Sequence, residues 1–139
     1  MTEIRGKRIV ITGATGFIGR NVAKMFLDHG ADVFVLVRAQ SKQKTLLPVH
    51  ENLHMVDGAL ADIAEAAEQI GSADAFLHFA WGGVNREEID SPVVQQQNID
   101  WSLSCVRAAA DLGCKVFMDA GSRVEYGIKE DGIMAEYMD

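Results

Sequence analysis

Short apolar runs alternate along the chain with longer segments in which apolar residues recur every three or four positions. The short runs are typical of buried strands, and the longer segments of amphipathic helices. The runs predict strands at 7–12, 32–37, 53–56, 75–79 and 115–119. The longer segments predict a helix from Gly19 to Gly30, one from Leu60 to Ile70 and one from about Val93 to Leu112, where Gly113 ends it.

One face of each predicted helix carries its larger apolar residues, and we expect that face to pack on the sheet. These residues are Ile18, Val22, Met25 and Phe26 in the first helix, Leu60, Ile63, Ala64, Ala67 and Ile70 in the second, and Ile99, Leu103, Val106 and Ala110 in the third.

Strands that are separated by helices imply right-handed crossovers and a parallel sheet. The pattern therefore predicts an α/β fold of the doubly wound, Rossmann type, with about five strands and helices on both faces. No linker-like segment interrupts residues 1–139, so we expect one domain. Ligands of such folds bind at the carboxyl ends of the strands.

A glycine-rich turn joins the first predicted strand to the first helix, with Gly13, Gly16 and Gly19 at spacings of three. One glycine lets the chain leave the strand in a tight turn, one lets the backbone approach a phosphate, and one lets the helix pack closely. The N-terminus of the helix supplies N–H groups and a positive dipole end. The turn therefore predicts a site for a dinucleotide pyrophosphate.

Composition and charge remove several other classes of function. The chain has 139 residues and a formal net charge of −7, which disfavours binding to nucleic acid. No stretch approaches the roughly 20 apolar residues of a membrane span, and no signal-peptide core follows Met1, so we expect no membrane partner and a cytoplasmic location. Cys105 and Cys114 form no CxxC pair and are expected to be reduced, packed thiols.

The segment from His50 to His54 spells HExxH, the pattern of zinc proteases. That motif requires both imidazoles on one face of a helix. Pro48 stands just before it and a predicted strand begins at Leu53, so we interpret the match as a coincidence and predict no metal site.

Several motifs in the chain occur in the order of a known family. They are the turn Thr12–Gly19, the triplet His78-Phe79-Ala80 after the fourth predicted strand, Asn98 in the next helix, and the segment from Ala120 to Gly127. Together they resemble the extended short-chain dehydrogenase/reductase family, which includes nucleotide-sugar epimerases and dehydratases. The resemblance implies an NAD(P)-dependent epimerase, dehydratase or reductase that acts on a nucleotide sugar or related carbonyl compound.

The resemblance also assigns site residues. Those expected to bind the cofactor are Gly13, Thr15, Gly16, Phe17, Ile18, Gly19, Arg38, Ser41, Lys42, Asp57, Asp62, His78, Phe79, Ala80 and Asn98. Ser122 matches the catalytic serine of the family. The family's YxxxK motif is not found, because neither Tyr126 nor Tyr137 has a lysine four residues later.

The sequence therefore resembles the N-terminal, cofactor-binding part of a longer enzyme. In that case a sheet edge or helix would be left uncovered, which predicts pairing with a second copy.

The choice between NADP and NAD depends on the residue that follows the second predicted strand. An acidic residue there binds the ribose hydroxyls of NAD, whereas Arg38 can bind a 2′-phosphate, with Ser41 and Lys42 close behind. We favour NADP, with NAD as the alternative. Ala59 stands where the family has an aspartate that contacts the adenine, which leaves backbone groups, Asp57 or Asp62 as substitutes.

Two further functions remain open at this point. A nucleotide-binding module that senses or sequesters its cofactor without turnover fits the missing YxxxK motif, and a purely structural α/β domain would bind neither nucleotide. The role of Trp81 is open as well, because it could form a wall of the substrate pocket or cover the edge of the sheet.

Overall fold

The structure is a computed structural model that describes residues 4–83, 85 and 87–122. Its centre is a five-stranded parallel sheet with the order β3-β2-β1-β4-β5. The strands are β1 (Arg8–Thr12), β2 (Asp32–Val37), β3 (Leu53–Asp57), β4 (Ala75–His78) and β5 (Val116–Asp119). The order reverses between β1 and β4, which is the switch point at which such sheets bind ligands.

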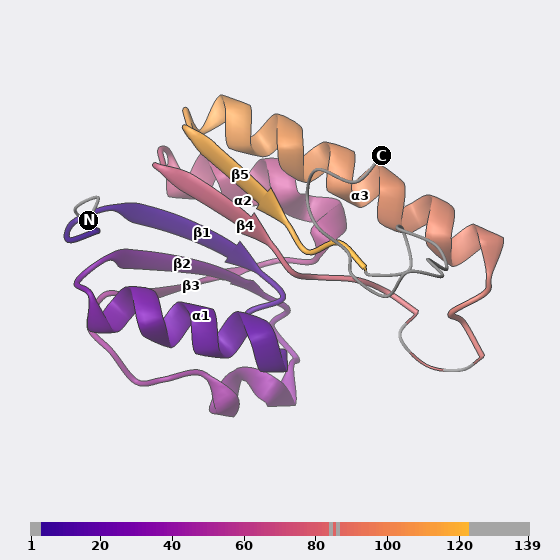
Figure 1. Cartoon of the computed structure of the whole chain (residues 1–139), viewed down its shortest axis with the longest axis horizontal. Helices are drawn as coiled ribbons and strands as arrows, with labels where there is room; N and C mark the ends of the chain where they lie inside the picture. Colours follow the sequence, from indigo (N-terminus) through magenta and orange to yellow (C-terminus); the bar gives the residue numbers. More distant parts are fainter. Residues whose placement is uncertain (1–3, 84, 86, 123–139) are drawn as a thin grey trace, which may run out of the picture.

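Helices cover both faces of the sheet, as Figure 1 shows. Helix α1 (Phe17–Asp28) lies on one face, and α2 (Ile63–Ile70) and α3 (Pro92–Asp111) lie together on the other. Two short 3-10 turns, η1 (Lys42–Leu46) and η2 (Leu60–Asp62), lie in the connections. The prediction of a doubly wound α/β fold with five strands is confirmed.

The core has two halves, one on each face of the sheet. Alternate residues of the central strands enter opposite halves, so that Ile9 and Ile11 pack under α1 while Val10 packs under α2 and α3. Because the central strands β1, β2 and β4 are covered on both faces, they are continuous apolar runs. The sequence predicts all five strands to within one residue at either end.

The predicted faces of the helices are partly wrong. In α1 the buried residues are Gly19, Ala23 and Leu27. Val22 and Phe26 pack against the core as predicted, whereas Ile18 and Met25 are exposed. In α3 the buried residues are Asn98, Cys105, Ala108 and Ala109, whereas the predicted stripe is exposed. That stripe comprises Ile99, Leu103, Val106 and Ala110. Both helices turn their small residues to the sheet, which lets the helix axis approach closely.

The segment predicted as one helix from Leu60 to Ile70 is divided into η2 and α2. Its buried face includes Ala66 rather than the expected Ala64, which is exposed. Leu60, Ile63, Ala67 and Ile70 contact the core as predicted.

Strand β5 lies at one edge of the described sheet, and helix α1 does not extend over it (Figure 1). Val116 and Met118 are each 51% exposed. The predicted uncovered edge is thus present in the described part of the chain; whether a second copy pairs with it stays a prediction.

No helix in the described part of the chain has both the length and the apolar character needed to cross a bilayer. The HExxH segment lies in a turn and a strand, because His54 belongs to β3. The two histidines therefore lack the helical geometry of a zinc protease. Cys105 is a buried free thiol and Cys114 a partly buried one. Burial, together with the charge of Asp119, raises the pKa of Cys105 to about 12, so this thiol is unreactive.

Candidate nucleotide-binding site

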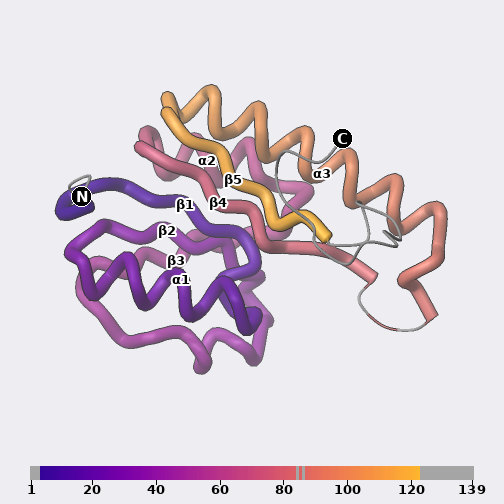
Figure 2. The backbone as a smooth tube through the Cα atoms, in the orientation of Figure 1, coloured from indigo at the N-terminus to yellow at the C-terminus, as the bar shows by residue number. Residues whose placement is uncertain are grey.

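A cleft of about 510 Å³ opens at the carboxyl ends of the strands. Figure 2 shows how the chain leaves β1, β4 and β5 at the same end of the sheet. The connections after β1, β2, β3 and β4 all contribute to the cleft. Among the residues predicted to bind a cofactor, those that line it are Gly13, Thr15, Gly16, Arg38, Ser41, Phe79 and Ala80.

The glycine turn is packed so closely that two of its glycines have no room for a side chain. Gly13 has a left-handed φ of 70°, and a Cβ there would lie 2.6 Å from the amide nitrogen of Ala80. A Cβ on Gly19 would collide with the carbonyl oxygen of Gly13. The first glycine therefore brings the turn against the chain that follows β4, and the third brings α1 against the turn.

The start of α1 has no side chain that caps it. Gly16 is the N-cap residue, and the first turn contains no acidic residue. The first backbone N–H groups of the helix, including those of Phe17 and Ile18, are therefore not used by a capping side chain. Such a helix start at the floor of a cleft favours an anion, because the N–H groups and the helix dipole both attract negative charge.

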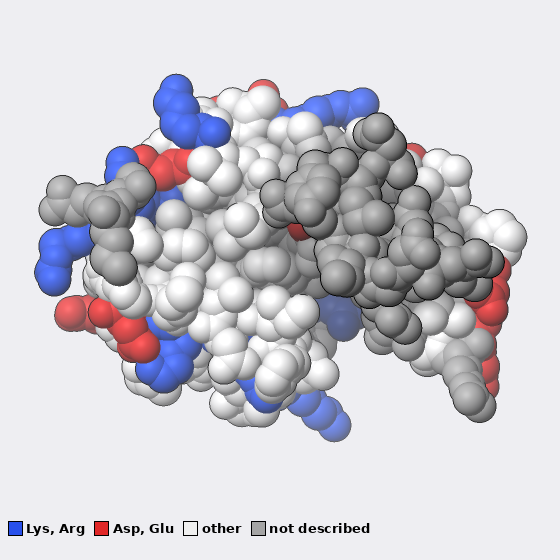
Figure 3. Space-filling view, viewed as in Figure 1, with Lys and Arg blue, Asp and Glu red and all other residues white. Residues whose placement is uncertain are grey.

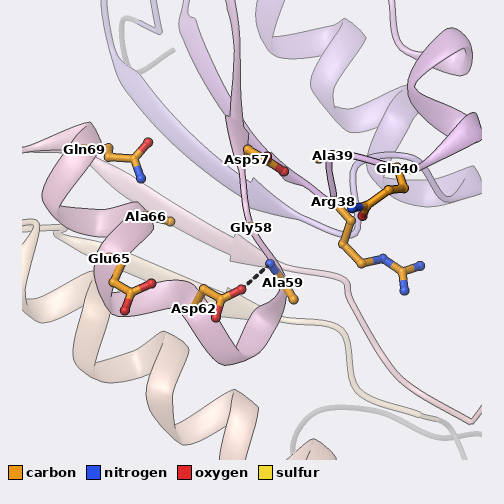
Figure 4. A pocket seen from close by; sticks show the side chains of 10 residues that line it. All are labelled: Arg38, Ala39, Gln40, Asp57, Gly58, Ala59, Asp62, Glu65, Ala66 and Gln69. Carbon is orange, nitrogen blue, oxygen red and sulfur yellow. Dashed lines mark hydrogen bonds between the residues drawn. The ribbon is translucent and has the colours of Figure 1, made fainter.

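Arg38 follows β2 and lines both this cleft and an adjoining pocket of about 380 Å³. Figure 4 shows the adjoining pocket, with Asp62 and Glu65 on one side and the Arg38 side chain extending away from α2. Within the described part of the chain, the Arg38 side chain makes no ion pair. The guanidinium is exposed and available to an anionic ligand.

The two acidic residues proposed as adenine contacts line the adjoining pocket rather than the main cleft. The carboxylate of Asp62 accepts a hydrogen bond of 3.0 Å from the backbone N–H of Ala59 (Figure 4). This bond fixes the turn after β3. Asp57 is exposed at the end of β3. Ser41 lines the cleft, whereas Lys42 is exposed in η1 and is not one of its lining residues.

His78 is buried behind the cleft and links three elements. Its Nδ1 lies 2.6 Å from the hydroxyl of Thr12 in β1, and its Nε2 lies 3.2 Å from the hydroxyl of Ser102 in α3. Burial lowers the pKa of this imidazole, and the charge of Asp119 opposes that shift in part. A neutral ring can donate through one nitrogen and accept through the other, so both bonds can form.

Asn98 is also buried behind the cleft, where it holds the backbone of Gly82. Its Oδ1 accepts a hydrogen bond of 2.8 Å from the N–H of Gly82, and its Nδ2 donates one of 3.0 Å to the carbonyl of the same residue. Nδ2 also contacts Gln95 at 3.3 Å. The carboxamide is thus engaged by the protein, and Asn98 reaches the cleft through Gly82.

Ser122 is exposed, three residues beyond the end of β5. The N–H of Ala120 donates to the carbonyl of His78 at 3.2 Å, which holds this segment beside the end of β4. The motif that supports Ser122 continues to Gly127, and its residues from Arg123 onward lie outside the described residues, as do Tyr126 and Tyr137.

Several lining residues were not predicted as site residues from the sequence, among them Gln43, Gly82 and Trp101. The sequence did hold a signal for Trp101. It lies three residues after Asn98, a predicted site residue, and residues three apart on a helix share a face. Trp81 lines the same cleft and is 46% exposed. Of the two interpretations open for Trp81, the structure favours a wall of the cleft.

The charged residues do not gather into one basic area on the face shown in Figure 3. Lys and Arg lie mainly around its margin, and much of its middle is uncharged. The Arg38 guanidinium is the only cationic side chain among the residues that line the described cleft.

Comparisons with known proteins agree with this geometry. A family model, the NAD dependent epimerase/dehydratase family, matches residues 9–138. A UDP-glucose 4-epimerase of Klebsiella pneumoniae is 26% identical over 128 residues, which cover 86% of this chain and 92% of that protein. A UDP-glucose 4-epimerase of Corynebacterium glutamicum is 22% identical, and the match covers 86% of this chain but 36% of that protein.

Solved structures show the same fold. The UDP-N-acetylglucosamine 4-epimerase from Methanobrevibacter ruminantium, in complex with UDP-N-acetylmuramic acid, has a TM-score of 0.80 at 26% identity. The match covers 96% of this chain and 43% of that one. The Bordetella bronchiseptica enzyme WbmH, in complex with NAD+, has a TM-score of 0.75 at 28% identity, over 90% of this chain and 42% of that one. The chain thus spans less than half of these solved chains.

Proposed function

The chain belongs to the NAD dependent epimerase/dehydratase family, and from this we propose that it is the cofactor-binding part of an enzyme that acts on a nucleotide sugar. The cofactor would lie in the cleft at the carboxyl ends of the strands, with its pyrophosphate at the Gly13–Gly19 turn. The chemistry that such a cofactor supplies is hydride transfer.

The observation that carries this proposal is the packing of the glycine turn. Gly13 lies against Ala80 without space for a Cβ, and α1 starts without a capping side chain. Helices α2 and α3 also start without a side-chain cap, but at α1 the uncapped start adjoins the cleft that Gly13, Thr15 and Gly16 line. A pyrophosphate would accept hydrogen bonds from the N–H groups there and gain from the helix dipole.

We also propose that NADP is preferred over NAD. Arg38 is exposed beside the cleft and has no ion-pair partner in the described part of the chain. A guanidinium can form two parallel hydrogen bonds with a phosphate, as a 2′-phosphate on the ribose would offer. Ser41 lines the same end of the cleft and can donate a further hydrogen bond. The relatives named above include one solved with NAD+, so the preference is a property of this chain that must be measured.

Calorimetric titration of the purified chain with NADP+ and NAD+ tests both proposals. We expect NADP+ to bind more tightly, and Arg38→Ala to weaken NADP+ by about ten-fold or more while changing NAD+ little, because only NADP+ carries the added phosphate. Arg107→Ala on α3 removes the same charge at an exposed residue that lines neither the cleft nor the adjoining pocket, and it is the matched control.

The outcomes are distinct. Equal binding of the two nucleotides, with an Arg38→Ala variant that behaves like wild type, would contradict the NADP preference and leave the dinucleotide site intact. No binding of either nucleotide would contradict the proposed site itself.

The proposed substrate class follows from the relatives, whose names include epimerases of UDP sugars. Ser122 remains the candidate for a hydroxyl that polarises the substrate oxygen, since it follows β5 beside the end of β4. Both assignments concern the whole enzyme. Turnover of UDP sugars by the whole enzyme tests the substrate class, and Ser122→Ala, which should lower turnover, tests the role of the hydroxyl.

A further inference from the structure

The two ends of the cleft differ in chemistry. At the end formed after β2 and β3, the lining includes Arg38, Ser41 and the turn from Gly58 to Leu60. At the end formed after β4, it includes Phe79, Trp81 and Trp101, and no charged residue. A dinucleotide lies across the crevice at the switch point, with the ribose of its adenosine half near the end of β2. Its other half would therefore lie at the aromatic end.

Both tryptophans of the chain line this one cleft. Trp81 comes from the segment after β4 and Trp101 from α3, so two separate elements contribute an indole to the same end. Trp81 is 46% exposed although it borders the cleft, whereas Trp101 is half-buried. A partly exposed indole at a cleft wall is available to a ligand ring.

Hydrogen bonds fix the backbone that carries Trp81. The carboxamide of Asn98 binds both the N–H and the carbonyl of Gly82, the next residue. A Cβ on Gly82 would lie 3.3 Å from Trp101 and 3.3 Å from Asn98, so the turn packs tightly on α3. The backbone next to Trp81 is therefore held before any ligand enters, which lowers the entropic cost of binding.

We propose that Trp81 binds the nicotinamide half of the dinucleotide and favours its oxidised form; this rests on the proposed function. The oxidised nicotinamide ring is positively charged and the reduced ring is neutral. Tryptophan is the strongest cation–π partner among the side chains, and its stacking energy adds to the charge effect. A partly exposed contact of this kind is expected to favour the oxidised form by about two- to five-fold.

The proposed contact has a consequence for the enzyme. A site that prefers the oxidised cofactor holds the form that is ready to accept a hydride from the substrate. Trp81 would then influence the redox state of the bound cofactor, in addition to its affinity.

Calorimetric titrations with three ligands test the proposal on wild type, Trp81→Leu and Trp81→Phe. The ligands are the oxidised and the reduced dinucleotide, and the ADP-ribose that matches them at the 2′ position (2′-phosphorylated for NADP), which lacks only the nicotinamide. We expect Trp81→Leu to weaken the oxidised dinucleotide by about two- to five-fold and the reduced form less, with ADP-ribose unchanged. Trp81→Phe should give an intermediate result. Leu103→Ala, on the exposed side of α3, is the control.

A second measurement does not depend on the folding of a Trp81 variant. In Trp101→Phe, Trp81 is the only tryptophan, so the fluorescence of the protein reports on it alone. We expect the oxidised dinucleotide to quench this fluorescence and ADP-ribose to leave it unchanged.

The results that would overturn the proposal are specific. A Trp81→Leu variant that weakens ADP-ribose as much as the dinucleotide would indicate a structural role, as would equal quenching by the two ligands. An unchanged ratio of affinities for the oxidised and reduced forms would contradict the redox preference. If wild type binds none of the ligands, the proposed function fails, and this inference fails with it.

Discussion

The two ends of the parallel sheet use their polar groups in opposite ways. At the amino end of the strands, charged side chains form hydrogen bonds with other side chains and with backbone groups. The guanidinium of Arg8 donates to the carbonyls of Ser72 and Ile70, each at 2.8 Å, and lies 4.4 Å from the centre of the Phe34 ring. Asp74 accepts hydrogen bonds from Lys7 and from the N–H of Arg8.

At the carboxyl end, close backbone packing takes the place of such a network. Gly13 and Gly19 have no side chains, and α1 starts without a side-chain cap. Of the buried polar residues there, Thr12 lines the cleft, whereas His78 and Asn98 lie behind it and hold its walls. The amino end therefore satisfies its polar groups internally, whereas the carboxyl end leaves backbone N–H groups for a ligand. We infer that substitutions at the first end change stability alone, and that those at the second end also change binding.

The largest expected effect comes from adding one methyl group at Gly13. Gly13→Ala would combine a left-handed φ with a Cβ placed 2.6 Å from backbone atoms of Phe79 and Ala80. We expect a loss of about 3 kcal/mol of stability, from backbone strain and overpacking. Cofactor affinity should fall by on the order of 100-fold, because the turn must move. Chemical unfolding and calorimetric titration measure the two effects.

Gly6 at the amino end provides the matched control. Its φ of 71° equals that of Gly13 to within a degree, but a Cβ there has no atom within 4 Å. Gly6→Ala should therefore cost about 1 kcal/mol of stability from strain alone, with unchanged cofactor binding. If the two variants bind the cofactor equally well, the functional difference between the two ends does not exist.

A smaller effect is expected from Arg8 at the amino end. Arg8→Met would remove two charge-assisted hydrogen bonds and the cation–π contact with Phe34, at a cost of about 2 kcal/mol. Arg20→Met is the matched control, since Arg20 lies 5.6 Å from the centre of the Phe17 ring, which is itself 75% exposed. It should cost less than about 0.5 kcal/mol.

Cofactor affinity should be the same in Arg8→Met and in wild type, once both are folded at the temperature of the titration. A several-fold loss of affinity in Arg8→Met would show that the amino end is coupled to the cleft, contrary to the comparison.

The sequence predicts the strands better than the helix faces. Strands buried on both sides are short apolar runs between glycine, proline and polar residues, so their bounds can be read directly. A helix face depends on which residues permit close packing. In both α1 and α3 the buried stripe lies one position away from the stripe of large residues, which is about 100° around the helix. Ala23 and Cys105 are buried because they are small, a preference that hydrophobicity alone does not reveal.

The candidate site shows a similar division. The glycine turn and Arg38 are local features, and their positions follow from the order of strand, turn and helix. Trp101 reaches the cleft only because the chain after β4 returns beside α3, where Asn98 binds Gly82. The sequence offers Asp62 as one of three substitutes for a missing adenine contact, and the structure adds that one of its carboxylate oxygens accepts the N–H of Ala59. Contacts between distant segments, and the internal use of a polar group, require the structure.

The smallest expected effect is the dependence of stability on pH. His78 at the carboxyl end of the sheet and Asp74 at the amino end should lose their contributions to stability at different pH values. Burial lowers the pKa of His78 below the ordinary value of about 6.5, against an opposing effect of Asp119. The unfolded chain therefore takes up this proton first, and stability falls as pH drops below about 6.5, by at most about 1.4 kcal/mol per pH unit. Hydrogen bonds from Lys7 and from the Arg8 N–H lower the pKa of Asp74, so its contribution is lost only below about pH 4.

Unfolding by urea at pH values from 8 to 3 would resolve these two contributions. His78→Asn should remove the fall in unfolding free energy between pH 6.5 and the folded pKa of His78. Asp74→Asn should change the unfolding free energy only below about pH 4, and by less than about 1 kcal/mol, because the Lys7–Asp74 pair is exposed. If His78→Asn does not fold, an NMR titration of the His78 ring gives the same answer, since the ring should stay neutral below pH 6.5. A ring that becomes charged at its ordinary pKa would show that water reaches the chain behind the cleft, and that the carboxyl end is more open than its packing indicates.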